Sequence, residues 1–366
     1  MVKTQSILFV QDPNEESELL SSDIVKENYN LLRHKLTSKD AFLKFMEEHR
    51  KQNITAIYGG FPAFRSIGGL TRDIIEHAAF YSTVRCVALC SRGVDGVDQE
   101  ALLERGIQLF NYQDSEPDAM VSGAKQDLVG NEVADCALWH VLEGFRKFSL
   151  LMTQMRATKD TILGRAVVAG IPRDQMRFAF GHELLKGKYV ESPRGKKCLI
   201  LGLGNIGKQI GVKLQYGLGM EVHYAKRTED SEVKDTYGWQ FHGMDSLLQV
   251  LPQFHAIVVA LPGSPETDGL INGEFLSHCK SGELILVNIG RAAILDMDAV
   301  TSAIDNGTIR HFGTDVYSAE PAVDALVLQD EYNTTGTPHV GSGTVEVFAQ
   351  ACETALANII RTTLPA

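Results

Sequence analysis

Long apolar runs are absent from this 366-residue sequence, and so is any excess of basic residues. The amino terminus offers only a five-residue apolar run before an acidic stretch, which is too short for a signal-peptide core or a membrane span. Lys and Arg number 35 against 46 Asp and Glu, a formal net charge of −11. Because an acidic surface repels a phosphate backbone, we expect neither nucleic acid nor membrane as a partner.

Cysteine is scarce and scattered. The six cysteines form no CxxC pair and no zinc-ribbon spacing, and five of them sit among apolar neighbours, as small core residues do. The eleven histidines show neither HExxH nor HxxEH spacing. We therefore expect a cytoplasmic protein from a reducing compartment that uses no catalytic metal.

The composition that remains is ordinary for a globular protein, with 44% hydrophobic and 22% charged residues, and the length favours two domains. The first third alternates short β-rich runs with helical periodicity, which indicates a parallel α/β sheet. Its predicted strands are 6–10, 56–60, 86–90 and 107–111. A helix is predicted over 38–49, with Ser38 as its cap.

The second half also reads as α/β. An apolar stripe predicts a long, mostly buried helix over Asn131–Phe148, where the chain crosses between domains. Residues 158–192 show mixed charge and no clean period, so we predict an irregular connection with about one helical turn. Near-continuous apolar strands then begin with CLIL at 198–201 and recur to IRHFGTDVY, typical of a second parallel sheet covered on both faces. The tail, 345–362, predicts another helix.

A glycine motif, GLGNIG at 202–207, follows the first of these strands and opens a helical run. In that context Gly202 permits a tight turn, Gly204 lets a pyrophosphate approach the backbone, and Gly207 lets the helix pack on the strand. The helix amino terminus, where Asn205 and Ile206 lie, faces the anion. The motif therefore predicts a dinucleotide site; the alternative is a glycine-rich turn used only for packing.

The next strand, at 220–224, ends without the acidic residue that usually grips the adenosine ribose. It is followed by Lys226, Arg227 and Thr228, which suit a 2′-phosphate that an aspartate would repel. NADP(H) is thus favoured, and NAD(H) remains possible. In the alternative, the two cations are solvated and Glu229 or Asp230 turns inward.

Three later segments each place an ionisable residue past a strand: VNIGR with Arg291, DVYSAEP with Glu320, and TPHVGS with His339. Carboxyl ends of parallel strands line the ligand crevice of such sheets, so these residues are expected to converge. Hydride transfer to a carbonyl needs a fixed cation, a proton donor and a carboxylate that orients the donor, which these three side chains supply. Taken alone, each residue has a structural alternative: Arg291 as a helix cap, Glu320 as a loop residue and His339 as a buried, hydrogen-bonded histidine.

These ordered motifs resemble the signature of the D-isomer-specific 2-hydroxyacid dehydrogenases, and within that family the fungal group of D-mandelate dehydrogenases and glyoxylate or hydroxypyruvate reductases. The resemblance implies two doubly wound α/β domains with a cleft between them. It implies a flavodoxin-like substrate domain from residues 1–122 and 338–366, and a Rossmann-type dinucleotide domain from 123–337. It also implies a homodimer formed through the dinucleotide domain.

The resemblance further implies roles for individual residues. Arg291 would hold the 2-oxo acid, His339 would be the acid–base group and Glu320 its partner. Main-chain amides around Arg92 and Gly93 would hold the substrate carboxylate, and Asp315 the nicotinamide amide. The remaining implied contacts are Gly60 for the substrate and Leu261, Pro262, Ile289 and Gly341 for the cofactor.

Two departures from the family pattern stand out. Lys226 replaces the common ribose-binding aspartate, and Ala292 follows Arg291 where glycine is usual. The resulting hypothesis is an NADPH-linked reductase that converts a 2-oxo acid to the D-2-hydroxy acid. Two alternatives are a formate dehydrogenase and a corepressor-like protein that senses NAD(P)H. The first is disfavoured because the formate dehydrogenase pattern pairs a histidine with a glutamine, whereas this sequence has Glu320.

Overall fold

The computed structural model describes residues 4–60, 63–113, 127–176, 183–185 and 188–364, with backbone alone for 183–185 and 188–189. The chain divides into two compact units: Met1–Leu128 with Thr344–Ala366, and Val129–Gly343. The predicted boundary at 122/123 lies outside the described residues. The second division falls at 343/344 rather than at 337/338, because Thr344 caps the helix that returns to the first unit.

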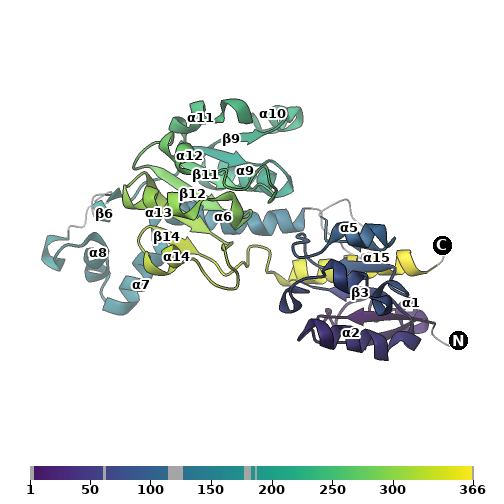
Figure 1. The fold of residues 1–366 in the computed structure, drawn as a ribbon. Helices are drawn as coiled ribbons and strands as arrows, with labels where there is room; N and C mark the ends of the chain where they lie inside the picture. Colours follow the sequence, from purple (N-terminus) through teal and green to yellow (C-terminus); the bar gives the residue numbers. More distant parts are fainter. Residues whose placement is uncertain (1–3, 61–62, 114–126, 177–182, 186–187, 365–366) are drawn as a thin grey trace. The chain divides into compact units, whose positions relative to one another are not determined.

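A five-stranded parallel sheet forms the first unit, in the order β2-β1-β3-β4-β5 (Figure 1). Its strands are β1 (Gln5–Phe9), β2 (Tyr29–Arg33), β3 (Ile54–Gly59), β4 (Cys86–Leu89) and β5 (Gln108–Phe110). In β1, Ile7 and Phe9 pack with Leu356, whereas Leu8 packs with Phe42 in a separate cluster. Both faces of the sheet are therefore covered, and the strand order is that of flavodoxin-like folds.

The helices of this unit come from both ends of the chain. They are α1 (Asp23–Asn28), α2 (Lys39–Glu48), α3 (Arg72–Ile75), α4 (Ala78–Tyr81), α5 (Gln99–Glu104) and α15 (Val345–Thr363). The predicted Ser38 cap is confirmed, since its Oγ accepts a hydrogen bond from the Ala41 amide at 3.1 Å. α15 is joined to β2 through the hydroxyls of Thr363 and Tyr29, 2.5 Å apart.

A seven-stranded parallel sheet forms the second unit, in the order β10-β9-β8-β11-β12-β13-β14. Its strands are β8 (Lys197–Leu201), β9 (Glu221–Lys226), β10 (Gln240–Gly243), β11 (Ala256–Val259), β12 (Leu284–Asn288), β13 (Ile309–Thr314) and β14 (Thr334–Gly336). The order reverses between β8 and β11, which is the Rossmann-type arrangement. The predicted fold class, two parallel α/β sheets, is confirmed.

The helices of this unit are α6 (Leu128–Arg146), α7 (Phe148–Thr158), α8 (Thr161–Ala169), α9 (Asn205–Leu218), α10 (Ser231–Tyr237), α11 (Leu247–Val250), α12 (Gly273–Ser277), α13 (Met297–Asp305) and α14 (Ala325–Gln329). They lie around the second sheet, except α7 and α8, which project away from it (Figure 1). α6 covers most of the predicted domain-crossing helix. None of the helices described is both long enough and apolar enough to cross a membrane.

The prediction of an irregular connection with about one helical turn over 158–192 is wrong for the part of this range that the structure describes. Asp160 caps α8 by accepting hydrogen bonds from the amides of residues 162 and 163, and Gly170 ends it in the left-handed region. The helical period was masked because Gly164 occupies a packed position, where a Cβ would lie 3.0 Å from the Met155 backbone. An antiparallel pair, β6 (Glu183–Leu185) and β7 (Lys188–Tyr189), follows.

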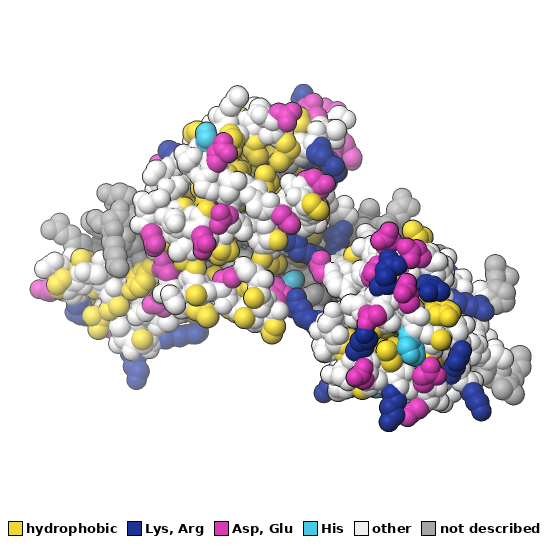
Figure 2. Space-filling view, viewed as in Figure 1, with side chains coloured by type: hydrophobic (Ala, Val, Ile, Leu, Met, Phe, Trp, Pro, Cys, Tyr) yellow, Lys and Arg dark blue, Asp and Glu magenta, His cyan; other side chains and the backbone are white. Residues whose placement is uncertain are grey.

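Helices α7 and α8 carry apolar side chains that the unit itself does not cover. Figure 2 shows hydrophobic side chains gathered over these two helices. The exposed ones are Phe148, Met152 and Met155 on α7, Val167 on α8, and Ile171 just beyond it. We refer to these five residues as the α7–α8 apolar surface.

Candidate active site

The second sheet brings the predicted cofactor and catalytic residues to one edge. All its strands are parallel, so their carboxyl ends meet on the same side. The glycine motif follows β8, the basic triplet ends β9, and Leu261 and Pro262 follow β11. Arg291, Asp315 and His339 come after β12, β13 and β14, which are neighbours in the sheet.

The glycine loop has the three geometries that a dinucleotide turn requires. Gly202 lies at φ +93°, in the left-handed region. A Cβ at Gly207 would lie 2.2 Å from the Gly202 carbonyl oxygen, so only glycine lets the helix start this close to the turn. A Cβ at Gly204 would meet nothing within 4 Å. Open space therefore lies before the first residues of α9, Asn205 and Ile206, where helix amides and the helix dipole favour an anion.

The end of β9 presents the basic triplet to solvent. Lys226 is partly exposed, and Arg227 and Thr228 are exposed. Asp230 does turn inward, as the alternative reading held, but it caps α10 by accepting a hydrogen bond from the amide of residue 233. Its Oδ2 also lies 3.3 Å from the Lys208 Nζ and 3.7 Å from the Lys226 Nζ. Burial raises the pKa of Asp230, but the hydrogen bond from the Val233 amide and the two ammonium groups outweigh this effect, so the pKa is lowered.

The loops after β11 and β12 are in direct contact. Ile289 is buried, and its amide donates to the β11 carbonyl of Val259 at 3.1 Å. A Cβ at Gly290 would lie 2.6 Å from the Leu261 carbonyl oxygen. Pro262, next in the chain, is exposed at the same loop. These residues therefore form one wall beside the glycine loop.

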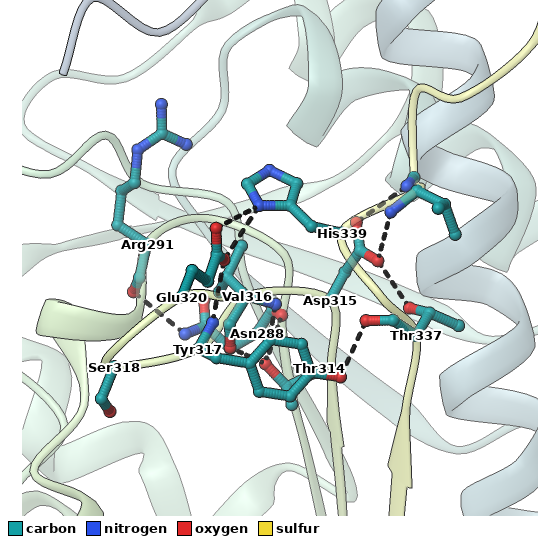
Figure 3. Close-up of polar contacts among 12 residues, drawn as sticks. Asn288, Arg291, Thr314, Asp315, Val316, Tyr317, Ser318, Glu320, Thr337 and His339 are labelled. Atoms are coloured by element: carbon teal, nitrogen blue, oxygen red, sulfur yellow. Dashed lines mark hydrogen bonds and ion pairs between the residues drawn. The ribbon is translucent and has the colours of Figure 1, made fainter. Parts of the chain in front are cut away.

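Arg291 is positioned by the last residue of β12. The Asn288 side-chain amide donates to the Arg291 carbonyl oxygen at 3.0 Å and accepts from the Gly290 amide at 3.0 Å. The Arg291 Nη1 donates to the Gly290 carbonyl oxygen at 2.9 Å. In Figure 3 the guanidinium extends on the same side of this network as the His339 imidazole.

Glu320 and His339 form the closest ionisable pair of the site. The His339 Nδ1 lies 2.9 Å and 3.0 Å from the two Glu320 carboxylate oxygens. The Tyr317 amide donates to the Glu320 Oε1 at 3.1 Å and helps to hold the carboxylate. An Nδ1–H that donates to Glu320 orients the ring, which leaves Nε2 as the outward atom. This is the arrangement expected of an acid–base histidine.

The backbone at His339 is unusual. Its φ is +53°, a left-handed conformation that is uncommon for residues other than glycine, although histidine adopts it more often than most. The buried carboxylate of Asp315, which is 4% exposed, holds the turn formed by residues 339–341. Its Oδ1 accepts from the Val340 amide at 2.9 Å and its Oδ2 from the Gly341 amide at 2.8 Å (Figure 3). The structure thus gives Asp315 a role in shaping the histidine loop.

The predicted substrate residues Gly60, Arg92 and Gly93 belong to the first unit, each past the end of a strand. A Cβ at Gly60, directly after β3, would lie 2.4 Å from the Gln11 Oε1. Asn111 donates to the Arg92 carbonyl, and Ser91 donates to the Gly93 carbonyl at 2.8 Å. These two bonds fix the loop after β4 through its carbonyls.

Sequence reasoning assigned no role to three residues that build the site. Asn288 positions Arg291, Thr337 donates to the Asp315 Oδ1 at 2.6 Å, and the Tyr317 hydroxyl donates to the Thr337 carbonyl at 2.8 Å. Burial raises the pKa of Tyr317 to about 12, so this hydroxyl keeps its proton. Asn288 could have been found from the sequence, because it is a polar residue at the end of the apolar strand LILVN. Among the described residues no group of His, Cys, Asp and Glu is arranged to hold a metal ion.

Fold and site together define a two-domain α/β protein with a Rossmann-type dinucleotide-binding domain. Residues 174–341 match the family pattern described as D-isomer specific 2-hydroxyacid dehydrogenase, NAD binding domain. A Saccharomyces cerevisiae protein whose name places it among the 2-hydroxyacid dehydrogenases is 52% identical over 97% of this chain and 93% of its own length. The chain therefore belongs to the D-isomer-specific 2-hydroxyacid dehydrogenases, a family of oxidoreductases.

Other similar proteins cover most of the chain. Glyoxylate/hydroxypyruvate reductase B of Pectobacterium atrosepticum is 28% identical, covering 80% of this chain and 79% of its own length. The holo crystal structure of Rhodotorula graminis D-mandelate dehydrogenase covers 100% of this chain and 98% of that one, with a TM-score of 0.81 and 26% identity. These similarities agree with the two-domain fold and the nicotinamide cofactor of the family.

Proposed function

We propose that this protein reduces a 2-oxo acid to the D-2-hydroxy acid with NADPH as the reductant. The observation that carries the proposal is the convergence of Arg291, Glu320 and His339 at the ends of three neighbouring strands, with the His339 Nδ1 on both Glu320 oxygens. A permanent cation beside an oriented imidazole is what carbonyl reduction requires of a protein.

Each residue has a defined task in this mechanism. The nicotinamide cofactor, when bound, supplies a hydride to the carbonyl carbon and is itself oxidised. Arg291 binds the substrate carboxylate and polarises the carbonyl through its fixed positive charge. The His339 Nε2 donates a proton to the carbonyl oxygen, which becomes the hydroxyl, while Glu320 orients the ring through its Nδ1.

The residues around the glycine loop fit the cofactor. The open space beside Gly204 suits a pyrophosphate on the first amides of α9. Lys226, Arg227 and Thr228 are at least partly exposed at the end of β9 and would bind the adenosine 2′-phosphate, which supports NADPH over NADH. Leu261, Pro262, Ile289 and Gly341 would line the remaining path of the cofactor.

The glycine loop makes a separable prediction. Gly204→Val is expected to weaken cofactor binding about tenfold or more with unchanged Tm, because the new side chain fills open space that the pyrophosphate would use. Gly207→Val is expected to lower Tm by about 5 °C or more, because its Cβ meets backbone at 2.2 Å. Fluorescence titration with NADPH and thermal unfolding measure the two effects. Unchanged cofactor affinity in Gly204→Val would contradict this assignment of the site.

The proposed assembly is a homodimer formed through the dinucleotide domain. The α7–α8 apolar surface supports it, because five large apolar side chains on neighbouring helices are costly to leave in water. These helices belong to the second unit, which holds the dinucleotide-binding sheet.

The function is tested by following NADPH absorbance with glyoxylate, hydroxypyruvate, phenylpyruvate and 2-oxoisocaproate. The panel includes both small and aromatic 2-oxo acids because the similar proteins are named as glyoxylate/hydroxypyruvate reductase and as D-mandelate dehydrogenase. We expect turnover of at least one compound and a D-configured product by chiral chromatography. Binding of NADPH without turnover of any compound would instead favour a protein that senses the cofactor.

A further inference from the structure

A line of hydrogen-bonded polar side chains, four of them buried and two threonines partly exposed, runs through the second unit and ends at Asp315. Its members, which we call the Lys147–Asp315 network, are Lys147, His311, Thr335, His140, Thr337 and Asp315. They come from the α6–α7 junction, β13, β14 and α6, so distant parts of the chain meet here. Buried polar groups are costly unless each is hydrogen-bonded, so an unbroken line of this length calls for an explanation.

Every step of the network is within hydrogen-bond distance. The Lys147 Nζ lies 2.6 Å from the His311 Nδ1, and the His311 Nε2 lies 3.0 Å from the Thr335 Oγ1. Thr335 lies 2.7 Å from the His140 Nδ1, whose Nε2 lies 3.2 Å from the Thr337 Oγ1. Thr337 then donates to Asp315 at 2.6 Å.

The direction of these bonds follows from chemistry at both ends. The Thr337 hydroxyl gives its single proton to Asp315, so it must accept one from the His140 Nε2. Burial lowers the pKa of His140 to about 3, so the ring is neutral and its Nδ1 accepts from Thr335. Thr335 in turn accepts from the His311 Nε2.

The opposite end is consistent with this direction. The Lys147 amine can donate to a bare Nδ1 on His311, which is the Nε2–H tautomer already deduced. Each hydrogen bond in the network then points from Lys147 toward the Asp315 carboxylate. Hydrogen bonds aligned in this way polarise and strengthen one another.

The surroundings are shaped for this arrangement. Lys147, His140 and His311 are 3%, 0% and 0% exposed. A Cβ on Gly313 would lie 2.7 Å from the His140 Cβ, so the absence of a side chain in β13 makes room for the ring. The network ends at Asp315, whose carboxylate oxygens accept hydrogen bonds from the amides of residues 340 and 341. These residues directly follow His339, whose backbone is in the left-handed conformation.

We propose that the Lys147–Asp315 network is a positioning device: it aims the Asp315 carboxylate at the amides of residues 340 and 341 and so fixes the turn from which His339 projects. His140, Thr335 and His311 are positioning residues, because none of them touches the acid–base pair. The catalytic part of this inference rests on the proposed function, whereas the shape of the turn does not.

The test removes one hydroxyl from the middle of the network. Thr335→Val keeps the side-chain shape but cuts the link between the two histidines; Thr335→Ser restores it. Thr334→Val is the matched control, since the Thr334 hydroxyl on the same strand donates to the Asp330 carbonyl outside the network. Thr335→Val is expected to speed hydrogen exchange at the amides of residues 340 and 341, and to lower kcat, each about tenfold, with the Kd for NADPH unchanged.

The rescue and control variants and an NMR measurement of the histidine tautomers complete the test. Thr335→Ser should recover exchange protection and kcat, and Thr334→Val should retain both. Nitrogen-15 NMR of the unmodified protein should show Nε2–H tautomers for His140 and His311, a reading that needs no variant. Normal exchange and kcat in Thr335→Val, or an Nδ1–H tautomer at either histidine, would overturn the proposal. If the unmodified protein reduced no 2-oxo acid, the proposed function would fail while exchange and tautomers still decided the network.

Discussion

Replacing His339 with glutamine is expected to lower kcat about a thousandfold, because the proton donor is lost while the loop that carries it is kept. Its Nδ1 partner, Glu320, would remain held by the Tyr317 amide at 3.1 Å, so the site should not collapse. Steady-state kinetics with NADPH and the best 2-oxo acid of the panel measure the effect.

A matched control for this variant is His278→Gln. His278 is an exposed histidine at the end of α12, and its Nδ1 lies 2.9 Å from the Glu274 carbonyl oxygen. It has no role in the proposed mechanism. Its replacement should leave kcat unchanged. The His339→Gln protein should still bind NADPH with parental affinity, since imidazole is not proposed to hold the cofactor. Activity within tenfold of the parent would remove His339 from the mechanism.

Exchanging Lys226 for aspartate is expected to reverse the cofactor preference, with kcat/KM for NADPH falling about a hundredfold and that for NADH falling little or rising. The ammonium at the end of β9 would be replaced by a charge that repels the 2′-phosphate and accepts a hydrogen bond from a ribose hydroxyl. Lys208 stays 3.3 Å from Asp230, so the cap of α10 keeps a cationic neighbour.

The control for the cofactor variant is Lys234→Asp. Lys234 is exposed on α10, one helix turn beyond Asp230, and its Nζ lies 3.4 Å from Glu229. It makes the same charge change near the same site and should leave the NADPH-to-NADH ratio of kcat/KM unchanged. A parent enzyme that already prefers NADH, or a ratio that moves equally in both variants, would show that the β9 triplet does not bind the phosphate.

Much of the architecture was predictable because it is encoded locally. Apolar runs such as 86–90 and 198–201 become strands buried on both faces, and Ser38 caps the helix that it was expected to cap. The glycine loop was recognisable because its three glycines follow a strand and open a helix, and the structure shows a steric demand at Gly202 and Gly207 and open space at Gly204.

Besides the β6–β7 pair, the strands that escaped prediction lie at the edges of the two large sheets. β2 and β10 are edge strands with partly exposed residues, and β14 has only three residues. Such strands carry a weak apolar signal because one side faces solvent. α8 escaped for another reason: its Gly164 packs against backbone, so a tight helix contact looked like a break in the helical pattern.

The candidate site shows the same division. The residue types of Arg291, Glu320 and His339, each after an apolar strand, pointed to carbonyl chemistry because parallel strands deliver their ends to one edge. The contacts that orient them come from pairings across long sequence separations, such as Asp315 with Val340 and Gly341.

The linear order of residues was sufficient for the two α/β sheets, the dinucleotide turn and the identity of the reactive side chains, since these follow from short-range periodicity and from which strand each residue follows. Folding in three dimensions alone decided that His140 and His311, 171 positions apart, are linked through one threonine hydroxyl. It also decided that Asn288 holds the Arg291 backbone. No local pattern encodes such contacts, because a hydrogen bond depends on where two atoms finish in space and not on how many residues separate them.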